Sequence, residues 1–258
     1  MSFAEDMRAK VRKLLKKLGL DVKFVTSDQK TRERHAREKA VKRWRFIASY
    51  SPKMILDIGA NVGQFASIAR QIVRDAHIVS FEPLADCCRQ LRSQEERLQP
   101  LTVVHAAVGE TDGVMMINRN ASSPSSSLLP MHQRHHEELP HTAQSTTEKV
   151  CVRRLDDVFD ELNVAFPLIV KIDVQGYTLP VLMGGRKTIR QAAAVIAEIS
   201  TTTLYEGEAT FDQVYQVMSS LNFDFGGTVD QWVSKQDGSV LQMDCLFVNR
   251  DFKIGINH

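Results

Sequence analysis

The chain has 258 residues, of which 43% are hydrophobic and 25% are charged, as in ordinary soluble globular proteins. No stretch approaches the roughly eighteen apolar residues of a membrane span, and Met1 is not followed by a signal-peptide pattern. None of the four cysteines belongs to a Cys-x-x-Cys pair, which favours free thiols in a reducing compartment. These features argue against a membrane-embedded or disulfide-stabilised protein, and we expect a cytoplasmic one.

The formal net charge is only +2, but the charge is unevenly distributed. Residues 1–50 contain fifteen Lys or Arg against six Asp or Glu, whereas the remainder contains eighteen against twenty-five. The sequence therefore predicts a basic helical extension over 1–50 and a mildly acidic domain over 51–258.

Two helices are expected in the basic extension. Over 4–20, apolar residues recur at helical spacing among lysines and arginines. Such a helix can pack on the domain, pack on a second subunit in a homodimer, or lie on an anionic membrane surface. Packing is the favoured interpretation. The second helix, over 31–47, carries a charge run typical of a solvated face, and we expect no nucleic-acid partner.

The first strong motif is a buried strand at 54–58, followed by a glycine turn and a helix over 64–74. Its spacing is Asp57-x-Gly59-x-x-x-Gly63. The middle glycine of the dinucleotide fingerprint is missing, which makes an NAD-dependent oxidoreductase unfavoured. The turn instead suits a nucleoside that carries an amino acid, bound against the N–H groups at the helix start.

A second strand, over 77–81, ends at Glu82, where a carboxylate could hold a ribose diol. Together with the glycine turn, this acid indicates an S-adenosylmethionine site. The competing interpretation is an ordinary strand–helix turn, because such glycines are common in α/β proteins.

The rest of the chain alternates between strands and helices, which predicts a mostly parallel sheet covered on both faces. We expect a Rossmann-like α/β fold that ends in an antiparallel hairpin. The remaining expected strands are 101–107, 114–118, 150–153, 168–172 and 193–200, with hairpin strands at 223–225 and 244–249 around an insert at 226–239; the expected helices are 85–98, 155–162 and 211–221.

The segment 118–148 interrupts this alternation. It is rich in serine and contains four histidines, but no cysteine or acidic cluster supports a metal site. A long irregular segment in a compact domain is usually functional or mobile. We expect a flexible lid over the active site and no metal.

Polar residues follow several of the expected strands at the carboxyl edge of the sheet, where ligands of such folds gather. Asp57, Glu82 and Val108 belong to this edge, and Asp173 and Gln175 follow the strand at 168–172. The competing, less favoured interpretation of Asp173 is a helix N-terminal cap. Glu198, at the end of another strand, suits either a buried hydrogen bond or a contact with the acceptor.

The chain resembles the FkbM family of S-adenosylmethionine-dependent methyltransferases. The matching segments are Leu-Asp-Ile-Gly-Ala-Asn-Val-Gly at 56–63, Phe-Glu-Pro at 81–83, Ala-Ala-Val-Gly at 106–109, Ser-Ser-Ser-Leu at 125–128, Lys-Ile-Asp-Val-Gln-Gly-Tyr at 171–177, Val-Ile-Ala-Glu at 195–198 and Leu-Phe-Val at 246–248. The resemblance implies a class I methyltransferase fold and O-methylation of a hydroxyl on a sugar, glycoconjugate or secondary metabolite. The basic segment at 14–20 is also similar to that of relatives encoded with polysaccharide-assembly enzymes, which implies a glycan acceptor.

Roles for the site follow from the motifs and the resemblance together. Asp173 is the candidate base or acceptor-positioning group, with Lys171, Gln175 and His105 as lesser candidates. The family usually carries a glutamate where Gln175 stands, so this chain departs from the pattern. The residues expected around the cofactor S-adenosylmethionine are Asp57, Gly59, Asn61, Gly63, Glu82, Ala107 and Val108, with Glu82 on the ribose and Ala107 and Val108 beside the adenine.

A different class of function fits the same residues. The chain could be a non-catalytic module that keeps the fold and is recruited to a partner or membrane by its basic helix. The glutamine at position 175 is the best support for this alternative.

Overall fold

In the computed structural model, the described residues are Met7, Val11, 27–120, 123–142 and 144–253. The helix expected over 4–20 falls almost entirely outside them. The chain divides into two compact units, Met1–Lys42 and Arg43–His258. The helix α2 (Ser27–Trp44) is followed by the 3-10 helix η1 (Arg45–Tyr50), whose Ile47 and Tyr50 are buried. The larger unit therefore begins before residue 51, the boundary expected from charge.

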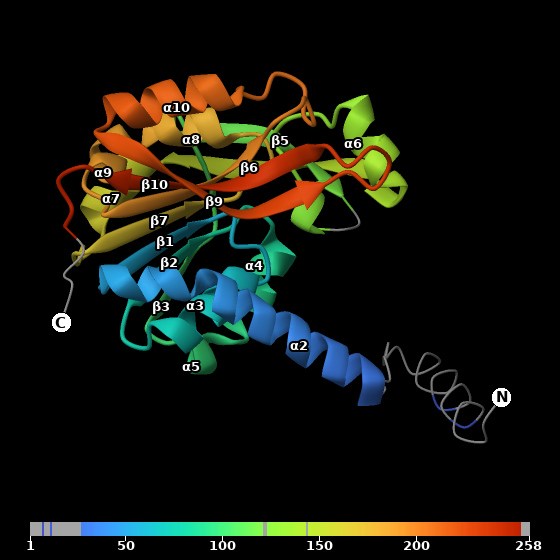
Figure 1. Cartoon of the computed structure of the whole chain (residues 1–258), viewed down its shortest axis with the longest axis horizontal. Coiled ribbons are helices and arrows are strands. Elements are labelled where there is room, and N and C mark those ends of the chain that lie inside the picture. Colours follow the sequence, from blue (N-terminus) through green and yellow to red (C-terminus); the bar gives the residue numbers. More distant parts are fainter. Residues whose placement is uncertain (1–6, 8–10, 12–26, 121–122, 143, 254–258) are drawn as a thin grey trace. The chain divides into compact units, whose positions relative to one another are not determined.

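A seven-stranded sheet forms the centre of the larger unit, in the order β3-β2-β1-β7-β8-β10-β9 (Figure 1). All of its strands run parallel except β10, which is antiparallel to both neighbours. The strands are β1 (Met54–Ile58), β2 (His77–Phe81), β3 (Leu101–Val104), β7 (Leu168–Ile172), β8 (Ala194–Ser200), β9 (Phe223–Val233) and β10 (Val240–Asn249).

Helices cover both faces of this sheet, as the alternating pattern predicts (Figure 1). Along β1, Leu56 and Ile58 face one apolar cluster while Ile55 faces the other, because successive side chains of a strand point to opposite faces. One face holds α3 (Gln64–Ile72), α4 (Ala85–Arg92), α5 (Glu95–Leu98) and η1; the other holds α7 (Leu155–Glu161), α8 (Thr178–Gly184), α9 (Arg186–Arg190) and α10 (Phe211–Ser220).

A second sheet has three strands in the order β4 (Ala107–Gly109), β6 (Ser145–Arg154) and β5 (Gly113–Asn120). The single strand expected over 101–107 is therefore wrong: the chain leaves the main sheet after β3 and enters the second sheet at β4. The antiparallel strand expected at 114–118 is confirmed by its pairing with β6.

The segment 118–148 is more regular than its composition indicates. Its two ends belong to β5 and β6, and between them lie η2 (Ser123–Ser125), α6 (Gln133–Glu138) and η3 (Pro140–Thr142). The start of β6, at 145–149, is polar and largely exposed, so no alternation of apolar residues reveals it.

The closing hairpin is confirmed, but its strands are longer than expected. β9 and β10 extend through most of the stretch that the sequence presents as an insert, leaving the connection at 234–239. β9 is an edge strand with mostly exposed side chains and two adjacent glycines. Its sequence therefore shows no clear alternation of apolar and polar residues. Among the described residues, no helix is long and apolar enough to cross a membrane.

Candidate active site

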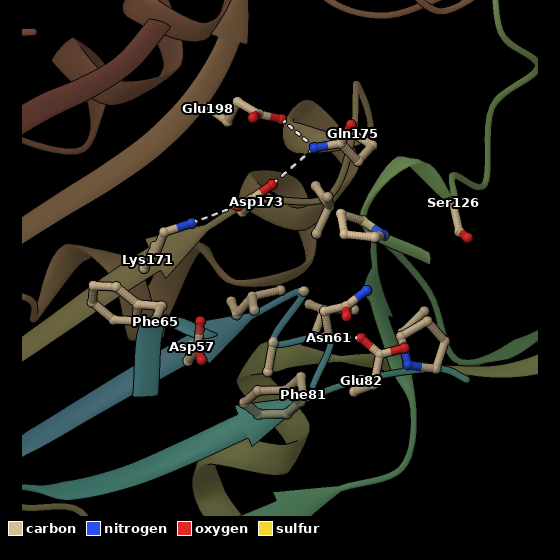
Figure 2. A pocket seen from close by; sticks show the side chains of 18 of the residues that line it. Asp57, Asn61, Phe65, Phe81, Glu82, Ser126, Lys171, Asp173, Gln175 and Glu198 are labelled. Carbon is tan, nitrogen blue, oxygen red and sulfur yellow. Dashed lines mark hydrogen bonds and ion pairs between the residues drawn. The ribbon is translucent and has the colours of Figure 1, made fainter. Parts of the chain in front are cut away.

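A cavity of about 380 Å³ opens at the carboxyl ends of the central strands of the main sheet. Figure 2 shows its two ends: Asn61 and Glu82 lie at one, and Asp173, Gln175 and Glu198 at the other. We call the first the β2 end, formed by Asn61, Glu82, Leu84, Val108, Ile117 and Leu128, and the second the acidic end, formed by Asp57, Lys171, Asp173, Gln175, Glu198 and Asp244.

The turn after β1 carries three residues with positive φ: Gly59 at 85°, Asn61 at 49° and Gly63 at 86°. A Cβ on Gly59 would lie 1.8 Å from the backbone oxygen of Asp173, so only glycine lets β1 and the segment after β7 approach this closely. At Gly63 a Cβ would meet Leu91 at 2.4 Å. Gly59 and Asn61 line the cavity, whereas Gly63 shapes the turn by packing on α4.

Glu82 at the β2 end is held by backbone groups. Its two carboxylate oxygens accept hydrogen bonds from the N–H of Asn61 and the N–H of Leu84, each at 2.8 Å. The residue is only 4% exposed, and burial raises the pKa of its carboxyl to about 7 in spite of these bonds. The acid is thus fixed in place beside the glycine turn.

Apolar side chains form the wall next to Glu82. Ala107 and Val108 line the cavity there, together with Leu84, Ile117 and Leu128. Ser126 and Ser127 add hydroxyl groups from the segment 118–148, which therefore contributes directly to the cavity. His105 lies outside the cavity lining, with its Nε2 atom 3.1 Å from the backbone oxygen of Pro83.

Asp57 is the most deeply buried acid of the cavity, at 1% exposure. Burial raises the pKa of its carboxyl to about 7, although the neighbouring Lys171 opposes the change. Its Oδ2 atom has no hydrogen-bond partner among the described residues. This oxygen is enclosed by the protein, and the hydroxyl of Ser80, which stands opposite Asp57 where β1 pairs with β2, joins Lys171 in opposing the rise in pKa.

Lys171 and Asp173 form an ion pair, with 2.8 Å between Nζ and Oδ2. Burial lowers the pKa of the Lys171 ammonium, but the nearby carboxylates, Asp173 first among them, outweigh burial and raise it. Burial likewise raises the pKa of Asp173, but Lys171 outweighs it and holds that pKa below the ordinary value. Both groups are therefore charged at neutral pH.

Aromatic rings shield this ion pair. The Lys171 Nζ atom lies 5.6 Å from the ring centre of Phe65 and 6.0 Å from that of Trp44. The two rings meet edge to face, 4.9 Å apart. They keep water from the lysine while the Asp173 side chain, 34% exposed, faces the cavity.

Gln175 connects the carboxylates of the acidic end. Its Nε2 donates to Asp173 Oδ1 at 2.9 Å and to Glu198 Oε1 at 2.7 Å (Figure 2). Its φ of 53° is unusual for a residue other than glycine and points the amide between the two acids. An amide cannot accept a proton as a base, so Gln175 orients the carboxylates instead.

Two further acids complete the acidic end, and Asp244 is absent from the residues that sequence analysis selects. Asp244 stands directly across from Glu198 where β10 pairs with β8. Burial raises the pKa of Asp244 to about 6, and burial followed by Asp173 raises that of Glu198 well above its ordinary value. Only the pairing of these distant strands could have identified Asp244.

The geometry fits a nucleoside that carries a charged amino acid. Glu82 has an apolar wall beside it for a base, and the carboxyl groups of the acidic end, with Asp173 ionised, suit positive charge. The strand order, with its one antiparallel strand, is that of the class I methyltransferase fold, and acids lie within β1, at Asp57, and directly after β2, at Glu82.

Comparison with known proteins identifies the family. The model of the methyltransferase FkbM domain matches residues 57–225, most of the chain, and the chain belongs to this family. It is 24% identical over 194 residues to the 2-O-methyltransferase NoeI of Sinorhizobium fredii (strain NBRC 101917 / NGR234), covering 73% of this chain and 78% of that protein. The protein is thus a methyltransferase with S-adenosylmethionine as its cofactor.

Solved structures with a similar arrangement include two methyltransferases. Magnesium protoporphyrin IX methyltransferase (ChlM) from Synechocystis PCC 6803 with bound S-adenosylmethionine is 10% identical, with a TM-score of 0.46 over 93% of this chain and 96% of that one. The O-methyltransferase segment of StiE, residues 961–1257, is 11% identical, with a TM-score of 0.47 over 88% and 79%.

Proposed function

We propose that the protein transfers the methyl group of S-adenosylmethionine to a hydroxyl of a sugar, glycoconjugate or secondary metabolite. The observation that carries this proposal is the carboxyl group of Asp173, which pairs with Lys171 at 2.8 Å and lines the cavity at the end of β7. When bound, the cofactor supplies a methyl group on a sulfonium, which is already a good electrophile. The protein has to orient the acceptor oxygen and receive its proton.

Asp173 would accept a hydrogen bond from the acceptor hydroxyl and take its proton as the new bond forms. Lys171 keeps this carboxylate ionised and in place, while Gln175 ties it to Glu198. Burial and Asp173 disfavour the charge of Glu198 and raise its pKa, so of the two carboxyl groups Glu198 is the one that favours the protonated form. The aromatic shield of Trp44 and Phe65 limits water beside the pair.

The cofactor would lie between the two ends of the cavity. Glu82 would bind the ribose hydroxyls with the lone pairs that its backbone bonds leave over, and Ala107 and Val108 would border the adenine. Asp57, which lines the cavity, would accept a bond from the amino acid portion. Gly59, Asn61 and Gly63 give the turn its shape.

The side chains of the acidic end favour a neutral acceptor over an anionic one. Four carboxyl groups, those of Asp57, Asp173, Glu198 and Asp244, line it with a single lysine, which already pairs with Asp173. A carboxylate or phosphate next to the reacting atom would thus find no unpaired cation among the described residues of the lining, whereas a neutral polyol can hydrogen-bond to carboxyl groups in either protonation state. The similarity to NoeI, a 2-O-methyltransferase, supports an oxygen acceptor.

The test is transfer of a radiolabelled methyl group from S-adenosylmethionine to a panel of glycans, glycoconjugates and hydroxylated metabolites, with the position of the label found by mass spectrometry. Label on an oxygen, lost in Asp173→Asn, is the expected result. Label on nitrogen or carbon would contradict the proposal. S-adenosylhomocysteine binding without transfer to any acceptor would favour the non-catalytic module instead.

A further inference from the structure

A chain of buried polar groups lies behind Gln175, on the side away from the cavity. The hydroxyl of Tyr205 donates to Gln175 Oε1 at 2.6 Å. The same hydroxyl lies 3.3 Å from Nε2 of His135, whose Nδ1 is 3.2 Å from the hydroxyl of Thr142. Tyr205, His135 and Thr142 are all buried, and none of them lines the cavity.

This chain links the Ser/His-rich segment to the acidic end. His135 belongs to α6 and Thr142 to η3, so both come from the stretch between β5 and β6. A second contact comes from the same stretch, because the Ser127 hydroxyl donates to the backbone oxygen of Gln175 at 2.5 Å. The segment therefore holds Gln175 both through its side chain and through its backbone.

The ring of Tyr205 also supports the backbone beside Gln175. Gly176 has a φ of 86°, and a Cβ there would lie 2.9 Å from three atoms of the Tyr205 side chain. The backbone of Gly176 thus packs directly against the Tyr205 side chain, with no room for a Cβ atom. Since Gln175 itself has a positive φ, the turn depends on this close contact to present the amide to the cavity.

The hydrogen bonds decide which way the amide points. With the Tyr205 proton on Gln175 Oε1, the NH₂ group is left for the two carboxylates, as observed. The phenol oxygen is then free to accept from His135 Nε2 in the tautomer that carries its proton on that nitrogen. The Thr142 hydroxyl, which donates to the backbone oxygen of Leu139 at 2.7 Å, is the neighbour of Nδ1 in either tautomer. Burial, with a smaller effect of His136, lowers the pKa of His135 to about 4, so the imidazole is neutral at physiological pH and donates through one nitrogen only.

We propose that Tyr205, held by His135, is a positioning residue that fixes the Gln175 amide with its NH₂ group toward Asp173 and Glu198. A flipped amide would aim its oxygen at two carboxylates, which only an added proton could satisfy. The orientation therefore stabilises the ionised forms of both acids. The inference concerns the ionisation of Asp173 and Glu198. The role of this ionisation in catalysis rests on the proposed function.

The groups that set the charge of Glu198 come from several elements. Asp173 and Lys171 face it from β7, Asp244 from β10, and Tyr205 from the loop after β8. Of these, Tyr205 is the one that binds the oxygen of the Gln175 amide, opposite the NH₂ group that faces Glu198. Replacing its hydroxyl removes a single uncharged group and leaves the three charged neighbours unchanged, so the variant isolates the orienting effect.

The experiment follows the carboxyl carbon of ¹³C-labelled Glu198 by NMR as the pH is varied, with the signal identified by Glu198→Gln. In Tyr205→Phe we expect the titration midpoint of Glu198 to rise by about one pH unit, the size expected for a lost hydrogen bond to a charged group. Tyr215→Phe removes the same hydroxyl from a more exposed tyrosine on α10 and should leave the midpoint unchanged. An unchanged midpoint in Tyr205→Phe overturns the proposal.

His135 gives a second, independent comparison. His135→Gln keeps an N–H donor near the position of Nε2, whereas His135→Leu keeps none. We expect the Glu198 midpoint of the glutamine variant to stay closer to the wild-type value, and equal shifts in both variants contradict the proposal. S-adenosylhomocysteine affinity, measured by calorimetry, should change by less than about twofold, because the altered groups do not touch the cavity.

The same variants separate this inference from the proposed function. If methyl transfer to hydroxyls occurs, the acidic limb of the kcat profile should move to higher pH in Tyr205→Phe, with kcat lowered about tenfold near that limb. If no hydroxyl is methylated but the Glu198 midpoint still shifts, the proposed function fails and the positioning role stands.

Discussion

The two ends of the cavity each contain an acid at the end of a strand, but they support it in different ways. At the β2 end, Glu82 is held by two backbone N–H groups of the turns beside it. At the acidic end, Asp173 is held by side chains, the ammonium of Lys171 and the amide of Gln175. Backbone donors are fixed by the fold, whereas side-chain donors depend on their own partners.

This difference matches the tasks proposed for the two acids. A carboxylate that only binds a ligand benefits from rigid donors that do not change during a reaction. A carboxylate that exchanges a proton needs neighbours that set its pKa, and here one of these neighbours is in turn held by Tyr205. Each of the following predictions tests one part of this contrast.

The largest effect is expected from Asp173→Asn. If Asp173 receives the acceptor proton, kcat should fall by about a thousandfold, the usual scale for loss of a general base. Affinity for S-adenosylhomocysteine should remain within a few fold, because Glu82 is unchanged. Asp224→Asn, which breaks an exposed ion pair with Arg250, is the matched control and should retain full activity. If the Asp173→Asn variant loses affinity for S-adenosylhomocysteine but keeps its kcat, Asp173 contributes to ligand binding and not to proton transfer.

The next effect concerns stability and the buried Asp57. Because burial raises the folded-state pKa of its carboxyl from 3.8 to about 7, the wild-type protein without ligand should lose stability as the pH rises from about 4 to about 7. Asp57→Asn has no such charge and should be the more stable protein at pH 8, by up to about 4 kcal/mol. Urea denaturation across this pH range measures the difference.

Asp86 should show the opposite dependence of stability on pH in the same experiment. The hydrogen bond from Arg119 holds the pKa of the Asp86 carboxyl below its ordinary value, so its charge favours the folded state. Asp86→Asn should therefore be destabilising at neutral pH and lose that penalty as the pH falls. A stability difference between Asp57→Asn and wild type that does not vary with pH would contradict the account of Asp57.

The smallest of these effects is expected at the β2 end. Glu82→Ala should weaken S-adenosylhomocysteine binding about thirtyfold, or roughly 2 kcal/mol, through lost hydrogen bonds to a charged group. Glu82→Gln keeps the shape and one oxygen and should lose less. Calorimetry measures both, and affinity equal to that of wild type in Glu82→Ala would remove Glu82 from the cofactor site.

Much of the fold could be predicted from local patterns. The strands β1, β2 and β7 are short apolar runs that end in acids, and Gly59 and Gly63 mark the turn after the first. Such signals are visible because each depends on neighbours within a few residues. They place Asp57, Glu82 and Asp173 at one edge of the sheet before any contact is known.

The weaker predictions failed where the pattern is not apolar. The division of 101–107 between two sheets and the polar strand at the start of β6 depend on pairing partners far along the chain. The histidines of the 118–148 segment likewise gave no clear signal. In the structure, His135 is a buried partner of Tyr205, an arrangement that composition cannot reveal.

The sequence by itself determined the family, the parallel sheet and the acids at the carboxyl ends of β1, β2 and β7, because hydrophobic periodicity and turn residues act over short distances. Only the tertiary structure decided that Asp244 faces Glu198, and that Tyr205 reaches the amide of Gln175. Those contacts arise when distant strands pair and loops pack together. Their geometry depends on the whole chain and not on any one segment.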